Sequence, residues 1–198
     1  MDEIINLKER SNNHYYYNDY TWNMKKLLIV VDFQKDFVDG SLGFEKAVVL
    51  DDLIYNKILE YKNNNDDIIY TFDTHDDDYM QTEEGANLPV KHCIKGTKGH
   101  ELYGKVNSLF DPNLDVYFEK PTFPSLELAY YLKDKQYNEV EVCGLVSNIC
   151  VLSNVVMVKS ALPNAKIIVD KKATDSFDKT LNDYTFEILK GIHVKVIE

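Results

Sequence analysis

Three residues whose side chains could perform covalent hydrolysis stand at the ends of short apolar runs. Asp32 ends the run Leu-Leu-Ile-Val-Val, Lys120 follows a second run, and Cys150 lies in a turn after a third. A thiolate attacks carbonyl carbon, a partly buried carboxylate moves the proton, and a nearby ammonium adjusts the pKa of the carboxyl group. Together these residue types predict nucleophilic attack on a small carbonyl compound.

The turn around Cys150 favours a reactive thiol. Ser147 or Asn148 can cap a helix that follows the turn, which places Cys150 in its first turn. There the helix dipole favours the thiolate, and free N–H groups could hold an oxyanion. The alternative is a buried, inert cysteine, and we interpret Cys143 as a core residue and Cys93 as a structural one.

A second group of residues has the character of metal ligands. Asp73 and His75 stand two apart at the end of an apolar run, and Glu84 and His92 follow in a loop. Carboxylate oxygens and imidazole nitrogens are suitable ligands for a divalent ion that keeps open water positions. Asp-x-His alone is a weak signal, and the alternative for His75 is an ordinary loop histidine.

The elements that must position these residues alternate regularly. The apolar, mostly β-branched runs are too short for helices and are typical of strands buried on both faces, whereas helical spacing lies between them. This alternation predicts a single three-layer α/β/α domain with a six-stranded, mostly parallel, Rossmann-like sheet. The expected strands are 27–33, 68–73, 116–119, 140–146, 167–170 and 194–197, and the expected helices are 46–62, 101–110, 125–135, 148–162 and 179–190.

The predicted sheet brings the two groups of residues together. Ligands of open parallel sheets bind beyond the carboxyl ends of the strands, near the point where the strand order reverses. Asp32, Asp73, Lys120 and the turn before Cys150 all follow strands. We therefore expect a carboxylate, an ammonium, a thiol and a metal site at one edge.

Bulk composition narrows the class of protein. A length of 198 residues predicts one domain, spanning 24–198, and residues 1–23 read as an N-terminal extension or short helix. The net charge of −11 argues against a nucleic-acid surface. No apolar run is long enough for a membrane helix, and no signal peptide is evident. Three cysteines without metal-type spacing predict reduced thiols and a cytoplasmic protein.

The motifs resemble those of a known family, the isochorismatase-like cysteine hydrolases, whose best-known members are nicotinamidases. The resemblance runs in order from about residue 27 to the C-terminus. It rests on residues 31–37 (VDFQKDF), 72–75 (FDTH), 88–97 (LPVKHCIKGT), 119–123 (EKPTF) and 144–151 (GLVSNICV).

The resemblance implies a role for each of the catalytic residues. Cys150 would be the nucleophile, Asp32 the base that takes its proton, and Lys120 the partner of both. A cis peptide would fall between Leu145 and Val146. The backbone N–H groups of Val146 and Cys150 would then form the oxyanion hole.

The resemblance also implies a metal cofactor. Asp73, His75 and His92 match ligands of nicotinamidases, in which the ion binds the pyridine nitrogen. One divalent ion is expected, zinc first, with iron or manganese as alternatives. The family's frequent dimers and tetramers imply a homo-oligomer.

Two positions depart from the family pattern. Where many nicotinamidases have another histidine, this chain has Gln81, so Glu84 is the expected ligand and Glu83 stays open. Phe37 matches a residue of the substrate pocket, whereas Leu88 replaces an aromatic residue that packs on the substrate ring.

The sequence thus predicts hydrolysis of a small carboxamide through a thioester, with nicotinamide converted to nicotinate and ammonia. Two alternatives stay open. One is an amidase for a carbamoyl or maleamate-like substrate, because Leu88 weakens the ring-binding wall. The other is a catalytically silent binding protein, because fold does not determine function.

Overall fold

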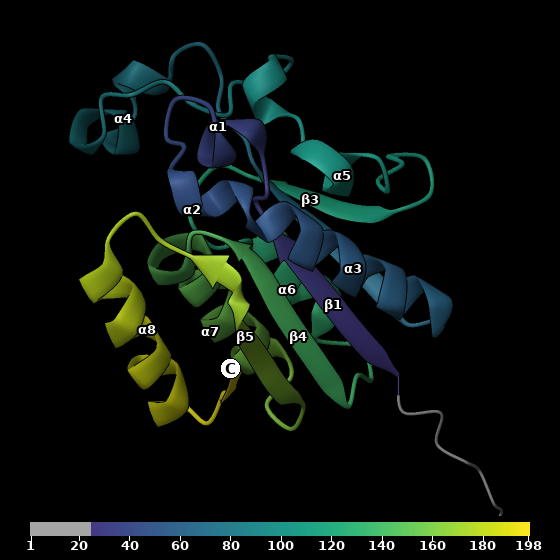
Figure 1. Cartoon of the computed structure of the whole chain (residues 1–198). Helices are drawn as coiled ribbons and strands as arrows, with labels where there is room; N and C mark the ends of the chain where they lie inside the picture. Colours follow the sequence, from purple (N-terminus) through teal and green to yellow (C-terminus); the bar gives the residue numbers. More distant parts are fainter. Residues whose placement is uncertain (1–24) are drawn as a thin grey trace, which may run out of the picture.

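Six parallel strands form one sheet at the centre of the protein, in a computed structural model that describes residues 25–198 (Figure 1). The strand order is β3-β2-β1-β4-β5-β6, and every neighbouring pair is parallel. The strands are β1 (Lys26–Val31), β2 (Asp67–Asp73), β3 (Val116–Lys120), β4 (Glu139–Leu145), β5 (Lys166–Asp175) and β6 (Lys195–Ile197).

Helices cover both faces of the sheet because the central strands are apolar on both sides. In β1, Leu27 and Ile29 face one hydrophobic cluster, and Leu28 and Val30 face the other. The first cluster is completed by α6 (Leu126–Leu132), α7 (Leu152–Ala161) and α8 (Lys179–Gly191). The second is completed by α2 (Glu45–Val48), α3 (Leu50–Asn63) and α5 (Gly104–Asn107).

Short elements gather beyond the carboxyl ends of the strands. Helices α1 and α4 lie there, at the top of Figure 1. The short elements are α1 (Lys35–Val38), η1 (Tyr79–Gln81), α4 (Glu83–Asn87), η2 (Lys98–His100) and the wide, π-helical turn η3 (Ser147–Val151).

The predicted three-layer domain is confirmed, and the sheet is parallel throughout. The predicted helix 101–110 is wrong for most of its length. Leu102 forms a bridge with Gln34, and Gly104 has a φ of +50°, so only one helical turn follows. The predicted strand 167–170 is too short, because β5 continues past Lys171 and Lys172 after a register shift against β4.

Two further expectations concern the N-terminal extension and membrane-spanning helices. The extension predicted for 1–23 lies outside the described residues. Between residues 25 and 198, no helix combines the length and apolar character that a membrane crossing needs.

The strand order reverses between β1 and β4, which are neighbours although β2 and β3 intervene in the sequence. The connections from β1 and β4 therefore diverge and leave a crevice at the carboxyl edge. Asp32 follows β1 and Cys150 follows β4, so both stand at this crevice.

Candidate active site

Cys150, Asp32 and Lys120 meet in the buried interior of this crevice. The Lys120 Nζ lies 2.6 Å from Asp32 Oδ2 and 3.6 Å from Cys150 Sγ. Thr71 donates a hydrogen bond of 2.7 Å to the second oxygen of Asp32. All four side chains are buried. The first three residues lie together as the sequence predicts, whereas no sequence pattern singled out Thr71.

Burial governs the protonation of these groups. It raises the pKa of Asp32 and that of the Cys150 thiol, while the Lys120 ammonium acts in the opposite direction on both. Burial works to lower the pKa of Lys120, but Asp32, Cys150 and Asp73 outweigh it and raise that pKa. The directions of these pKa shifts favour a thiol beside an ammonium, against the expectation that the helix dipole and free N–H groups favour the thiolate.

The turn that presents Cys150 begins with a cis peptide between Leu145 and Val146, as the family resemblance implies. Val146, in extended conformation, precedes the π-helical turn, and its carbonyl accepts the N–H of Val151. The predicted side-chain cap is wrong. Ser147 instead donates its hydroxyl hydrogen to Asn182 of α8.

Backbone geometry allows β1 and β4 to lie close together next to Asp32 and Cys150. Asp32 has a φ of +46°, in the left-handed region, at the point where the chain leaves β1. Gly144 of β4 has a φ of +112°, and a Cβ there would lie 2.0 Å from the carbonyl oxygen of Val31. Glycine at 144 is therefore needed for β4 to approach β1 beside the nucleophile.

The four predicted ligands form a second cluster beside the first. One ligand atom from each of them lies within 4.8 Å of all the others. The Asp73 Oδ2 is 3.0 Å from His75 Nε2 and 3.3 Å from His92 Nε2, and Glu84 Oε1 is 3.7 and 3.6 Å from the same nitrogens. These residues come from β2, the segment after it, α4 and the following loop.

The cluster fits a divalent metal ion. His92 bonds the Val90 carbonyl through Nδ1 at 2.8 Å, which leaves Nε2 facing the cluster. Burial works to lower the His92 pKa, but Asp73 and Glu84 raise it to about 10. The two carboxylates favour positive charge at this position. The Glu84 Oε2 is buried without a hydrogen-bond partner. Two nitrogen and two carboxylate ligands suit zinc and similar ions.

The alternatives for the fourth ligand lie outside the cluster. Glu83 accepts a hydrogen bond of 2.8 Å from Asn87, in the same short helix, and is exposed. Gln81 is exposed as well. Glu84 is therefore the carboxylate that completes this cluster.

Asp73 joins the two clusters. Its Oδ1 lies 3.3 Å from Lys120 Nζ, and its Oδ2 faces the imidazoles of His75 and His92. Although burial opposes ionisation, Lys120 and the two histidines hold the Asp73 pKa well below its usual range. Gln34, fully buried, bonds both the backbone N–H and the carbonyl of Asp73 at 2.8 and 2.9 Å.

A cavity of about 100 Å³ connects Cys150 with the ligand cluster. Phe37 and Leu88, the predicted pocket residues, both line it. The Phe37 ring packs near the His92 ring, with centroids 5.5 Å apart. The sequence analysis missed further apolar residues of the wall. They are Leu42, Phe123, Ile149 and Phe177.

Tyr79 is another residue that the sequence analysis missed. Its ring centroid lies 4.7 Å from that of His75 and 5.0 Å from that of His92. Its hydroxyl donates to the Leu88 carbonyl at 2.8 Å. The positions of two of these residues in the sequence could have indicated their proximity to the site. Phe123 lies three residues after Lys120, and Tyr79 lies between the predicted ligands His75 and Glu84.

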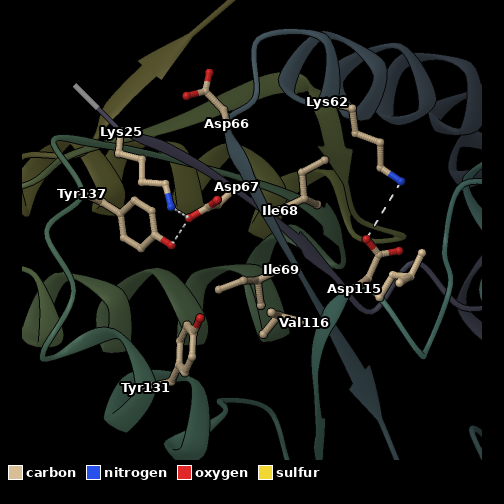
Figure 2. A pocket seen from close by; sticks show the side chains of 11 residues that line it. Lys25, Lys62, Asp66, Asp67, Ile68, Ile69, Asp115, Val116, Tyr131 and Tyr137 are labelled. Carbon is tan, nitrogen blue, oxygen red and sulfur yellow. Dashed lines mark hydrogen bonds and ion pairs between the residues drawn. The ribbon is translucent and has the colours of Figure 1, made fainter. Parts of the chain in front are cut away.

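A larger hollow of about 390 Å³ lies at the opposite, amino-terminal edge of the sheet (Figure 2). Most of its charged groups have polar partners within the hollow: Asp67 pairs with Lys25 and accepts from the Tyr137 hydroxyl, both at 2.6 Å, and Lys62 pairs with Asp115. No cysteine or histidine is among the described residues that line it. This hollow is larger than the cavity beside Cys150, but the groups able to react with a substrate lie at the carboxyl edge of the sheet.

The chain matches known proteins in both sequence and fold. A family model described as the isochorismatase domain matches residues 26–198. The isochorismatase family protein PncA of Bacillus subtilis (strain 168) is 34% identical over 167 residues, which cover 79% of this chain and 89% of that protein. The chain belongs to the isochorismatase family and is a hydrolase.

Solved structures agree with this assignment. The crystal structure of nicotinamidase PncA from Bacillus subtilis superposes with a TM-score of 0.78 at 29% identity, covering 88% of this chain and 100% of the other. Pyrazinamidase of Pyrococcus horikoshii, solved in complex with zinc, shares the fold with a TM-score of 0.76 at 21% identity, covering 88% of this chain and 99% of the other. The chain thus has a nicotinamidase-like structure.

Proposed function

We propose that this protein hydrolyses a small aromatic carboxamide, nicotinamide to nicotinate and ammonia, through a thioester on Cys150. The observation that carries the proposal is the meeting of two clusters at one cavity. Cys150 stands with Asp32 and Lys120 on one side, and the metal-ligand set stands on the other. A silent binding protein would not require a buried thiol, carboxylate and ammonium in contact.

The first half of the reaction forms the thioester. The Cys150 thiol gives its proton to Asp32, and the sulfur attacks the amide carbon while Lys120 balances the negative charge. The N–H groups of Val146 and Cys150 are proposed to hold the resulting oxyanion. When the C–N bond breaks, Asp32 returns the proton to the leaving nitrogen and ammonia departs.

The second half releases the acid. Asp32, again a carboxylate, takes a proton from water as the water oxygen attacks the thioester carbon. The C–S bond breaks and Asp32 returns its proton to the sulfur. The product leaves as nicotinic acid, which gives its remaining acidic proton to solvent and becomes nicotinate. Burial raises the Asp32 pKa, which suits a group that accepts and donates the same proton in turn.

The proposed cofactor is one divalent ion, zinc first, with iron or manganese as alternatives. Asp73, His75, Glu84 and His92 would hold it, and a bound ion would supply a Lewis acid able to take a ring nitrogen. The Pyrococcus horikoshii structure, which contains zinc on the same fold, supports this choice.

A comparison of nicotinamide with benzamide tests the proposal, because benzamide has the same shape without the ring nitrogen. We expect metal-loaded enzyme to release ammonia from nicotinamide at least about 100-fold faster, as positioning is worth several kcal/mol. Chelation should remove the preference and added zinc, manganese or iron should restore it. Equal, chelator-independent rates would refute the nicotinamide assignment and favour another amide substrate, as Leu88 in the wall allows.

A further inference from the structure

The outer part of the catalytic cavity carries an aromatic ring that is strongly exposed to solvent. Phe37 and Phe123 also line the cavity, but Phe37 is half-buried against His92 and Phe123 is 41% exposed. Phe177 is 63% exposed, although it lines the same cavity as Cys150. An apolar ring at a cavity mouth gains most when a ligand covers it.

Hydrogen bonds fix the turn that carries Phe177. It follows Asp175, the last residue of β5, whose carboxylate accepts from the Ser176 N–H at 2.8 Å and from the Asn182 amide at 3.1 Å. Asp178 caps α8 by accepting from the Leu181 N–H at 2.9 Å. Although the Phe177 side chain is exposed, hydrogen bonds hold the backbone of its turn in place.

A further hydrogen bond places this turn relative to Cys150. Asn182 accepts a hydrogen bond from the Ser147 hydroxyl, and Ser147 is the first residue of the π-helical turn that contains Cys150. From the other side, the Phe44 ring meets the Phe177 ring edge-on, with centroids 6.4 Å apart and planes at 81°. Phe177 is thus held at a set position beside the cavity.

We infer that Phe177 determines specificity by packing its ring on the aromatic ring of the substrate at the mouth of the cavity. The inference rests on the proposed function, since it assigns the substrate class of that same site: planar ring amides rather than short aliphatic amides. Leu88, the wall residue near the metal ligands, is aliphatic and cannot supply such a face. Phe177 is too exposed to serve the protein core.

The Phe177→Ala variant tests this role by the separation of KM from kcat. Loss of the ring contact should raise KM for nicotinamide about fivefold to tenfold, the equivalent of one aromatic pair, with kcat within about twofold. Phe177→Tyr should restore the wild-type KM. Tyr184→Ala is the matched control, because Tyr184 is 60% exposed on α8 but does not line the cavity, and it should leave both constants unchanged.

Alkylation of Cys150 by iodoacetamide provides a readout that needs no turnover. The reagent has no ring, so its rate with free enzyme should agree within about twofold between wild type and Phe177→Ala. Nicotinate should protect the thiol, and the concentration for half-protection should rise about fivefold or more in the variant.

Each contrary result has a distinct meaning. An unchanged KM and unchanged protection in Phe177→Ala, with active wild type, would overturn the inference and leave the proposed function standing. Parallel losses of kcat and of alkylation rate would show a structural effect, which also overturns it. A wild-type enzyme that neither hydrolyses nicotinamide nor is protected by nicotinate would refute the proposed function, and the inference with it.

Discussion

A single carboxylate, Asp73, connects the proton chemistry with the metal-ligand set. Its two oxygens face Lys120 on one side and the His75 and His92 imidazoles on the other. Gln34, which follows β1, holds the Asp73 backbone through two hydrogen bonds. If the carboxylate turned fully toward one group, it would lose its contact with the other. We propose that Asp73 is therefore a ligand whose position also constrains Lys120.

Replacement of the nucleophile should stop the reaction without unfolding the protein. We expect Cys150→Ala to lower ammonia release by more than about 1000-fold, because no other group can form the thioester. Cys143→Ala is the matched control, since Cys143 is equally buried on β4 but lies outside the cavity. Circular dichroism checks the fold of both variants. Substantial activity in Cys150→Ala would exclude the covalent route.

Metal content should distinguish the two buried aspartates. We expect Asp73→Asn to lose most of its bound metal and Asp32→Asn to keep it, because only Asp73 faces the imidazoles. Both variants should be nearly inactive, and both are close to isosteric with the native side chain. Elemental analysis of the purified proteins makes the comparison. Similar metal loss in both would mean that Asp32 belongs to the ligand set.

Residue types and motif order predicted which polar side chains would meet, but not their protonation. The sequence places Cys150 after a strand, which suggested a thiolate at a helix end. The pKa of this thiol depends on complete burial beside Asp32, which only tertiary packing shows. Phe177 was missed for a similar reason, since nothing in its sequence neighbourhood marks it as part of the cavity.

Among the elements, α7 supports the nucleophile through one buried amide. The Asn154 side chain accepts from the Ser125 N–H at 2.9 Å and donates to the carbonyls of Phe123 and Cys150 at 3.1 and 2.8 Å. Ser125 in turn caps α6. This side chain therefore fixes the π-helical turn against the start of α6 and against one wall of the cavity.

Loss of this amide should destabilise the fold. We expect Asn154→Ala to lower the free energy of unfolding by about 2–3 kcal/mol, because buried backbone groups lose their partners. Asn164→Ala, at an exposed position, is the control and should stay within about 0.5 kcal/mol of wild type. Urea unfolding measures both. Equal stability of the two variants would show that water replaces the lost hydrogen bonds.

Periodicity predicted the long elements better than the short ones. The continuous apolar run of β1 is visible in the sequence, and so is the amphipathic face of α8. The segment 101–110 has helical spacing, yet the pairing of Leu102 with Gln34 keeps its start extended. Long-range pairing of this kind leaves no periodic signal.

At the scale of the whole molecule, strand order decides where the site lies. Because β4 is inserted next to β1, the two connections diverge there, and the Cys150 thiol and the Asp32 carboxylate both contact Lys120 at the opening. The ligand cluster adds a tie between β2, α4 and the loop that carries His92. These segments are separate in the sequence, so an ion held among them would join them directly.

Removal of the metal should therefore lower the thermal stability of the whole protein. A ligand present at about 100 times its Kd adds roughly 2.7 kcal/mol. For a domain of this size, that corresponds to a fall in Tm of roughly 5–10 °C on chelation. Differential scanning calorimetry with and without zinc measures the shift.

Two adjacent carboxylates give this prediction a matched control. Glu84→Gln should lose most of the metal-dependent shift, because Glu84 faces both imidazoles. Glu83→Gln should keep the full shift, because Glu83 is exposed and bonds Asn87 instead. Cys150→Ala should also keep it, since the thiol is outside the ligand set. If the Glu83 and Glu84 variants respond alike, or if chelation leaves the wild-type Tm unchanged, the four residues do not form a metal site.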